Sequence, residues 1–459
     1  MEQITKPHCG ARLDRLPDCR WHSSMFAIVA FGLLVCWSNA VGGLILAQLK
    51  ALGWTDNSTT ATFSAITTAG MFLGALVGGI IGDKTGRRNA FILYEAIHIA
   101  SMVVGAFSPN MDFLIACRFV MGVGLGALLV TLFAGFTEYM PGRNRGTWSS
   151  RVSFIGNWSY PLCSLIAMGL TPLISAEWNW RVQLLIPPIL SLIATALAWR
   201  YFPESPRWLE SRGRYQEAEK VMRSIEEGVI RQTGKPLPPV VIADDGKAPQ
   251  AVPYSALLTG VLLKRVILGS CVLIAMNVVQ YTLINWLPTI FMTQGINLKD
   301  SIVLNTMSMF GAPFGIFIAM LVMDKIPRKT MGVGLLILIA VLGYIYSLQT
   351  SMLLITLIGF FLITFVYMYV CYASAVYVPE IWPTEAKLRG SGLANAVGRI
   401  SGIAAPYAVA VLLSSYGVTG VFILLGAVSI IVAIAIATIG IETKGVSVES
   451  LSIDAVANK

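Results

Sequence analysis

Hydrophobic and polar positions along the chain separate into long apolar runs and short polar breaks. The first six apolar runs cover 23–47, 60–81, 89–108, 113–136, 151–174 and 181–200. A second set covers 266–291, 302–323, 331–348, 352–377, 392–414 and 419–440. Each run is long enough to cross a membrane as one helix. The pattern therefore predicts an all-α membrane protein with twelve transmembrane helices in two groups of six.

The polar breaks predict the orientation and the domain organisation. Most of the 33 Lys and Arg residues fall in alternate breaks, which the positive-inside rule places in the cytoplasm together with both termini. The longest polar insert divides the chain, and its stretch 214–230 has the charge spacing of a surface helix. We predict a cytoplasmic N-terminal segment at 1–22, a six-helix bundle at 23–200, a cytoplasmic central loop with amphipathic helices at 201–265, a second six-helix bundle at 266–440 and a cytoplasmic tail at 441–459.

The composition excludes several other classes of protein. Hydrophobic residues make up 56% of the chain and charged residues only 12%, about half of the ~25% typical of soluble domains. The net charge of +9 agrees with attraction to an anionic inner leaflet, so nucleic acid is not needed as a partner. Seven scattered cysteines, three histidines and the lack of a Walker motif argue against a disulfide framework, a metal site and ATP-driven transport. We expect a carrier, and not an enzyme, with no cofactor and no metal.

Two short motifs recur in the two groups of helices. Asp83-Lys84-Thr85-Gly86-Arg87-Arg88 follows the second apolar run, and Asp324-Lys325-Ile326-Pro327-Arg328-Lys329 follows the eighth. Glu138-x-x-Pro141 with Arg145 follows the fourth run, and Glu380-x-x-Pro383 with Lys387 and Arg389 follows the tenth. The recurrence at equivalent places indicates an internal duplication of six spans.

Three further motifs complete a family pattern. They are Arg118-x-x-x-Gly122-x-Gly124-x-Gly126, the run from Pro203 to Leu209 (PESPRWL) and the run from Glu442 to Gly445 (ETKG). With the repeated turns they make the chain resemble a major facilitator superfamily transporter of the sugar porter, organic-ion and niacin carrier branch. The resemblance implies a monomer in which two bundles enclose one central site that opens alternately to each side. The short outer loop after the first span favours a bacterial inner membrane over a eukaryotic carrier.

Charged residues at the cytoplasmic turns form a candidate gate. Ion pairs of this kind are worth only about 1 kcal/mol each when wet, so a carrier can break several of them as it opens. We expect the arginines to meet the glutamates across the bundle interface and Asp83 to cap a helix, although the arginines could serve only to enforce topology. The candidates are Asp83, Arg87, Arg88, Glu138, Arg145, Glu204, Arg207, Asp324, Arg328, Glu380, Lys387, Arg389 and Glu442.

Polar side chains inside the seventh span predict a substrate site, because polar groups at membrane depth usually face a cavity. Asn277, Tyr281 and Asn285 share one helix face, and Gln280 lies beside them. Sugar porters, which the chain resembles, bind substrate with Gln and Asn on this span; hydrogen bonding between helices is the alternative. Weaker candidates, some of which could serve only for packing, are Asn39, Asn157, Tyr369 and Tyr372.

Arg399 lies near the middle of the eleventh span, about 10 Å or more into a core of about 30 Å. A guanidinium facing a water-filled cavity suits a carboxylate, which it can hold with two hydrogen bonds. In the organic-ion carriers that the chain resembles, a span-eleven arginine followed by a proline, here Pro406, goes with anionic substrates. A structural cation bonded to backbone carbonyls is the alternative.

The sequence leaves open which group, if any, couples transport to a proton. In sugar porters the arginine at the position of Arg118 partners a span-one aspartate that carries the proton, whereas span one of this chain has no acid and its nearest polar residues are Cys36, Ser38 and Asn39. Glu95 and His98 share a helix face and can titrate when partly buried, so they are candidates for a relay or for a plain hydrogen bond. A third possibility is that Arg118 or Arg399 binds the substrate's carboxylate together with a proton.

These observations favour a secondary transporter that imports a small carboxylate, such as a sugar acid or an aromatic acid like nicotinate, with a proton. A neutral sugar or polyol porter, as symporter or uniporter, is the alternative. A nutrient sensor with a carrier fold is a remote alternative.

Overall fold

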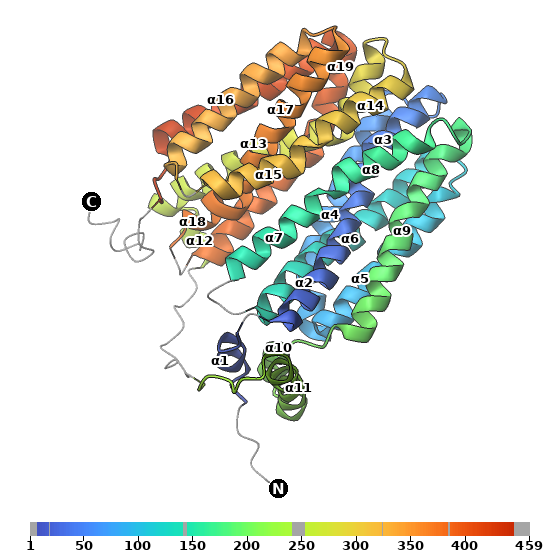
Figure 1. Ribbon diagram of the computed structural model, residues 1–459. Helices are drawn as coiled ribbons and strands as arrows, with labels where there is room; N and C mark the ends of the chain where they lie inside the picture. The colour runs from blue at the N-terminus through green and yellow to red at the C-terminus, as the bar shows by residue number, and fades with distance from the viewer. Residues whose placement is uncertain are drawn as a thin grey trace. The chain divides into compact units, whose positions relative to one another are not determined.

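The computed structural model describes residues 7–17, 19–140, 145–240, 253–323, 325–383 and 386–444, and all regular elements in this part of the chain are helices (Figure 1). The all-α prediction is confirmed. Helix is the expected form in lipid, because a helix satisfies its backbone hydrogen bonds within one segment.

The first span is interrupted, since α2 (Arg20–Leu33) passes through a 3₁₀ turn, η1 (Leu34–Cys36), into α3 (Trp37–Ala51). The fifth predicted span is likewise divided, into α7 (Arg145–Asn157) and α8 (Ser159–Leu170). The other helices of the first half are α4 (Asn57–Thr85), α5 (Arg87–Ala106), α6 (Met111–Tyr139) and α9 (Ala176–Tyr201).

The second half begins with the long helix α13 (Gly260–Thr293). Its tenth predicted span is α17 (Met352–Cys371) followed by a π-helical turn, η3 (Tyr372–Tyr377), and the short α18 (Val378–Glu380). The remaining helices are α14 (Leu298–Met309), α15 (Gly311–Val322), α16 (Arg328–Ser347) and α19 (Lys387–Ile439).

Among the described residues, ten helices are long and apolar enough to cross a membrane. The last of them, α19, is 53 residues long and covers the eleventh and twelfth predicted spans, because the backbone turns at Gly417 with φ 65° and ψ −159°. The divided helices α7 and α8 cover the fifth. The twelve predicted spans and the helices are therefore consistent.

By contacts the chain divides into two compact units, which are not the two predicted halves. Unit 1 contains Met1–Ser38, Gly70–Ser159 and Leu184–Gly246; unit 2 contains Asn39–Ala69, Tyr160–Gln183 and Lys247–Lys459. Two segments of the first half thus belong with the second half. The predicted domain boundaries at 200 and 266 stay predictions.

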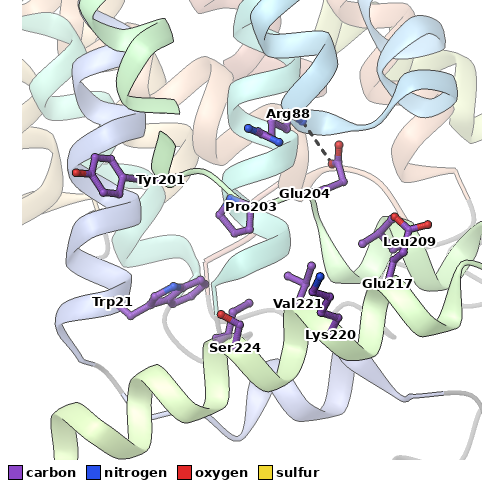
Figure 2. Close-up of a pocket in the computed structure, with 11 residues that line it drawn as sticks. Trp21, Arg88, Tyr201, Pro203, Glu204, Leu209, Glu217, Lys220, Val221 and Ser224 are labelled. Carbon is purple, nitrogen blue, oxygen red and sulfur yellow. Dashed lines mark hydrogen bonds between the residues drawn. The ribbon is translucent and has the colours of Figure 1, made fainter. Parts of the chain in front are cut away.

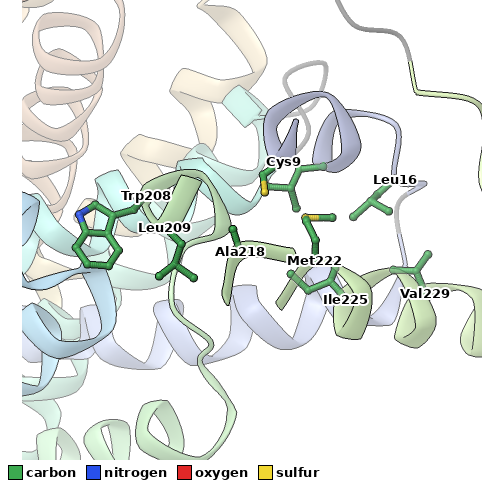
Figure 3. Packing of buried hydrophobic residues seen from close by; sticks show 9 residues of the cluster. Cys9, Leu16, Trp208, Leu209, Ala218, Met222, Ile225 and Val229 are labelled. Carbon is green, nitrogen blue, oxygen red and sulfur yellow. The ribbon is translucent and has the colours of Figure 1, made fainter. Parts of the chain in front are cut away.

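Unit 1 carries a set of helices outside the spans: α1 (Cys9–Asp14), α10 (Pro206–Ser211) and α11 (Tyr215–Thr233). A further helix outside the spans, the short α12 (Tyr254–Leu257), belongs to unit 2. The predicted surface helix at 214–230 is confirmed as α11. Its apolar face, with Met222, Ile225 and Val229, packs against Cys9 and Leu16 of the N-terminal segment (Figure 3). The hydropathy pattern predicted no helix in the N-terminal segment, but in the structure this segment packs against the central loop.

Ion pairs hold α1 on α11. Arg12 pairs with Glu219 and, at 2.6 Å, with Glu226, and Arg15 reaches Glu226 at 2.6 Å. Burial by itself would raise the pKa of Glu226, but the hydrogen bonds from Arg12 and Arg15 outweigh burial and lower that pKa. The carboxylate therefore stays ionised, and the two arginines share it.

Candidate transport site and cytoplasmic networks

The first charge network lies at a turn predicted to be cytoplasmic and is centred on Arg87, the first residue of α5. Its guanidinium donates to Glu138 at 2.9 Å, to Asp83 at 2.7 Å and to the Gly82 carbonyl at 2.9 Å. Its backbone N–H donates to Glu204 at 2.7 Å, and the neighbouring N–H of Arg88 reaches the same oxygen at 3.4 Å (Figure 2). Glu204 thus places a carboxylate at the helix N-terminus, where the backbone leaves N–H groups unpaired.

The second network repeats this arrangement around Arg328, the first residue of α16. Its guanidinium donates to Glu380 at 3.0 and 3.1 Å and to the carbonyl of Met323. Glu442 accepts from the backbone N–H groups of Arg328 and Lys329 at 2.7 and 3.1 Å. The repeated motifs predicted equivalent turns for Arg87 and Arg328 and for Glu138 and Glu380. They did not predict that Glu204 and Glu442 would accept hydrogen bonds from the first N–H groups of α5 and α16.

The pairs in both networks form within one half of the chain, whereas we expected pairs across the bundle interface. The reason is local: each arginine starts a helix whose neighbouring turns already supply a glutamate and a carbonyl. Asp83 pairs with the Arg87 side chain, and its backbone carbonyl accepts from Trp208 Nε1 at 2.7 Å. The capping carboxylate for α5 is Glu204.

The remaining gate candidates have other partners or lie outside the described residues. Arg88 donates to the Trp199 carbonyl, Arg207 pairs with Asp14 at 3.0 Å, and Arg389 lies over the Tyr254 ring at 5.2 Å. Asp324 lies outside the described residues, as do the side chains of Arg145 and Lys387.

Unit 2 joins the ends of first-half helices to the second half, at the ends predicted to face outward. A Cβ on Gly43 of α3 would lie 2.4 Å from the Ile284 carbonyl oxygen of α13, so only glycine permits this approach. Asn57 of α4 donates to Ser414 of α19 at 2.9 Å. Asn305 of α14 donates to Ser164 of α8 at 3.0 Å. These contacts close the predicted outer side within this unit.

The polar face of α13 is packed against α19 in the same unit. Asn277 is buried and donates to the Leu273 carbonyl at 2.7 Å, one turn earlier in its own helix. A Cβ on Gly398 would lie 3.0 Å from Asn277 Nδ2, and one on Gly402 would lie 3.2 Å from the Tyr281 ring. The predicted stripe on span seven therefore faces the part of α19 that carries Arg399.

Arg399 Nη1 is buried and has no hydrogen-bond partner among the described residues. The side chain as a whole is half-buried, as are Gln280 and Tyr281. A guanidinium nitrogen is a strong hydrogen-bond donor. A buried donor whose hydrogen bond is not made costs about 1–3 kcal/mol, and more if it is charged. This nitrogen is therefore available to an acceptor that the described residues do not provide.

Tyr369 and Tyr372 are fully buried in the second half. Tyr369 donates to the Val272 carbonyl at 3.1 Å, and Tyr372 stacks on Tyr377 with ring centroids 5.0 Å apart. Both side chains make packing contacts in this structure, and their assignment to a substrate wall stays a prediction. Asn157 donates to Ser153 in its own helix at 2.8 Å, and Asn39 is buried at the beginning of α3.

Arg118 and His98 meet at one residue of the first span. Arg118 Nη1 donates to the backbone carbonyl of Ser38 at 2.7 Å. The Ser38 hydroxyl lies 2.6 Å from His98 Nε2, and the Ser191 hydroxyl lies 3.2 Å from His98 Nδ1. Glu95 Oε2 is 3.7 Å from His98 Nδ1, which confirms that the two residues share a helix face. Sequence reasoning noted Ser38 only as a polar residue and missed Ser191, since a serine carries no pattern that marks its partner.

The helical membrane fold with a duplicated charge network is that of a multi-pass transporter. The family model for sugar (and other) transporters matches residues 24–455. This chain belongs to that family, within the major facilitator superfamily, and is a metabolite transporter of the inner membrane and not an enzyme.

Two curated relatives extend along nearly the whole chain. The inner membrane metabolite transport protein YdjE of Escherichia coli (strain K12) is 44% identical, over 98% of this chain and 99% of the relative. The niacin transporter NiaP of Acinetobacter baylyi is 26% identical, over 96% and 99%. Among solved structures, the inward-open xylose transporter XylE of E. coli has a TM-score of 0.74 at 18% identity, over 94% of this chain and 99% of that one. The last likeness shows the fold.

Proposed function

We propose that this transporter imports a small organic acid together with a proton. The observation that carries the proposal is the buried, unpartnered Nη1 of Arg399 on α19, beside the helix face of α13 that holds Asn277 and Tyr281. A carboxylate accepts two parallel hydrogen bonds from one guanidinium, so an anionic substrate supplies the partner that the described residues do not offer.

The amides and hydroxyl on α13 then bind the rest of the molecule. Asn277, Gln280, Tyr281 and Asn285 offer both donors and acceptors, which suits the hydroxyl groups of a sugar acid or the ring edge of an aromatic acid. The name of NiaP supports this class, because niacin is an aromatic carboxylic acid.

A neutral sugar or polyol is the second candidate, favoured by the same polar stripe. The xylose transporter XylE, which shares the fold, has been solved with 6-bromo-6-deoxy-D-glucose bound. In that case Arg399 would serve the structure alone, and its removal would leave sugar uptake unchanged.

Uptake into liposomes distinguishes the two candidates. Purified protein is offered labelled gluconate, nicotinate, xylose and inositol, with and without an inward proton gradient. One proton per acid anion sustains up to about tenfold accumulation for each pH unit, because one unit corresponds to 1.36 kcal/mol. We expect an acid to accumulate and a sugar not to.

The Arg399 variants test the assignment of the carboxylate. Arg399→Gln removes the charge, and Arg399→Lys keeps the charge but loses the bidentate geometry. We expect both to lose acid uptake, the glutamine variant more severely. Lys299→Ala, at an exposed position near the beginning of α14, is the matched removal of a cation and should transport normally. Normal acid accumulation by Arg399→Gln would refute the proposal.

A further inference from the structure

His98 on α5 is completely buried, and both of its ring nitrogens face hydroxyl groups from other helices. Ser38 of α3 is 2.6 Å from Nε2, and Ser191 of α9 is 3.2 Å from Nδ1. A neutral imidazole carries one N–H, so it donates at one nitrogen and accepts at the other. A hydroxyl can take either role, which makes both serines able to follow a change in the protonation of the ring.

The charged groups around this imidazole come from two helices. Glu95 of α5, also completely buried, places Oε2 3.7 Å from Nδ1. Arg118 of α6 is held on the Ser38 carbonyl. The spans contributed by α3 and α9 carry ionisable groups only toward their ends, at Lys50, Glu177, Arg181, Arg200 and Tyr201. A proton added to His98 is therefore attracted by one carboxylate and opposed by one guanidinium, both at fixed positions.

We propose that His98 is the group that carries the coupling proton, and that Ser38 is the positioning residue that transmits its protonation to the first span. This inference rests on the proposed symport. The proton adds to the free lone pair of the ring, and the imidazolium then donates from both nitrogens. The Ser38 hydroxyl, if it was donating to Nε2, must become an acceptor and turn its own hydrogen elsewhere.

The position of Ser38 gives this reversal a structural consequence. Ser38 follows the 3₁₀ turn Leu34–Cys36 that separates α2 from α3. Its released hydrogen can reach the carbonyl of Leu34, four residues earlier, a bond that bends helices. Meanwhile Arg118 fixes the Ser38 carbonyl. Protonation of His98 thus acts at the break in span one. The helix that follows this break, α3, carries Gly43, which packs closely against α13.

Transport with and without a gradient tests this role. The labelled acid that the wild-type protein accumulates is measured in two assays: accumulation under an inward proton gradient, and exchange against unlabelled acid at equal pH. His98→Gln should lose accumulation, from about tenfold per pH unit to simple equilibration, and retain exchange. Ser38→Ala should also lose most of the accumulation, because the protonation of His98 no longer reaches the first span, and it should shift the pH at which exchange is half-maximal.

Matched controls separate this role from general damage. His22→Gln changes the other buried histidine of unit 1, and Ser101→Ala removes a hydroxyl that donates to the His98 backbone carbonyl and not to the ring. Both should behave like wild type. Because the chain has three histidines, ¹⁵N-histidine NMR follows His98 directly, and its titration should move in Ser38→Ala but not in Ser101→Ala.

Three results would overturn the inference. Gradient-driven accumulation by His98→Gln would show that another group carries the proton, and loss of coupling in Glu95→Gln alone would identify that group as Glu95. Loss of exchange as well as accumulation in a folded His98→Gln would make the residue structural. A wild-type protein indifferent to the gradient would refute the symport proposal itself, which distinguishes the two failures.

Discussion

The charge networks around Arg87 and Arg328 use the same arginine geometry but differ in the segments that are attached to them. In the first half, Trp208 and Arg212 of the central loop donate to the Asp83 carbonyl at 2.7 and 2.6 Å, so peripheral helices are attached to the turn. In the second half the cover is the C-terminal tail, where Thr443 donates to Glu380 at 2.6 Å. The two halves therefore share the arginine with its glutamates, whereas a different segment is attached to each network.

The turn that enters each helix also differs. Gly86 precedes α5 with φ 95°, and a Cβ there would lie 2.2 Å from Glu204 Oε2. Pro327 precedes α16 with φ −58°, an ordinary value for proline. The first network therefore depends on a glycine and the second does not.

The largest expected effect is at this turn. Gly86→Ala forces a side chain into a backbone conformation that costs about 1–3 kcal/mol, and it also displaces Glu204 from the α5 backbone. We expect a lower midpoint of thermal unfolding in detergent and slower uptake in liposomes. Pro327→Ala is the matched change and should have little effect. Equal effects of the two substitutions would remove the distinction between the turns.

Removal of the central arginine of each network, Arg328 or Arg87, should have the second largest effect on stability. Arg328→Ala leaves Glu380 without its guanidinium partner, at a cost of about 1–3 kcal/mol for hydrogen bonds to charged groups. Arg87→Ala should cost less, because the Arg87 side chain is 16% exposed and that of Arg328 only 7%. The unfolding midpoints of both variants measure this order. A larger loss at Arg87 would mean that the attached helices add to the first network.

The attachment of the central loop is tested by Trp208→Phe, which keeps an aromatic ring and removes the bond to the Asp83 carbonyl. The expected loss is about 1 kcal/mol. Trp382→Phe is the matched control, because Trp382 Nε1 is buried without a hydrogen-bond partner among the described residues. An unchanged unfolding midpoint for Trp208→Phe would show that packing alone holds the loop.

The smallest expected effect is a difference in pH dependence between the two capping glutamates. Burial raises the pKa of Glu204, so stability from this group is present at low pH and is lost as pH rises through the folded-state pKa. Burial would also raise the pKa of Glu442, but hydrogen bonds from three backbone N–H groups outweigh it and lower that pKa. Stability from Glu442 is therefore present above the unfolded pKa of about 4.3 and is lost as pH falls.

Unfolding midpoints at several pH values measure this difference. As pH rises, wild type should lose stability relative to Glu204→Gln and gain it relative to Glu442→Gln. Parallel trends for the two variants would contradict the comparison.

Much of the fold could be predicted from the sequence. Apolar runs are local and periodic, so they predicted the helices, and the repeated motifs predicted equivalent turns in the two halves. The same reasoning missed the break in the first span, because the apolar run continues through it and the 3₁₀ turn carries no composition signal. It also missed the docking of α1, since six residues are too few for a clear pattern.

The sequence by itself determined the class of this protein: a helical membrane transporter with repeated motifs, with cations at the turns that the pattern predicts to be cytoplasmic and one arginine deep in span eleven. Only the tertiary structure decided the partners. Ser38, His98 and Ser191 come from three helices, and Glu204 reaches Arg87 from the end of another. Hydrogen bonds act over about 3 Å, so they depend on how helices distant in sequence are rotated and packed.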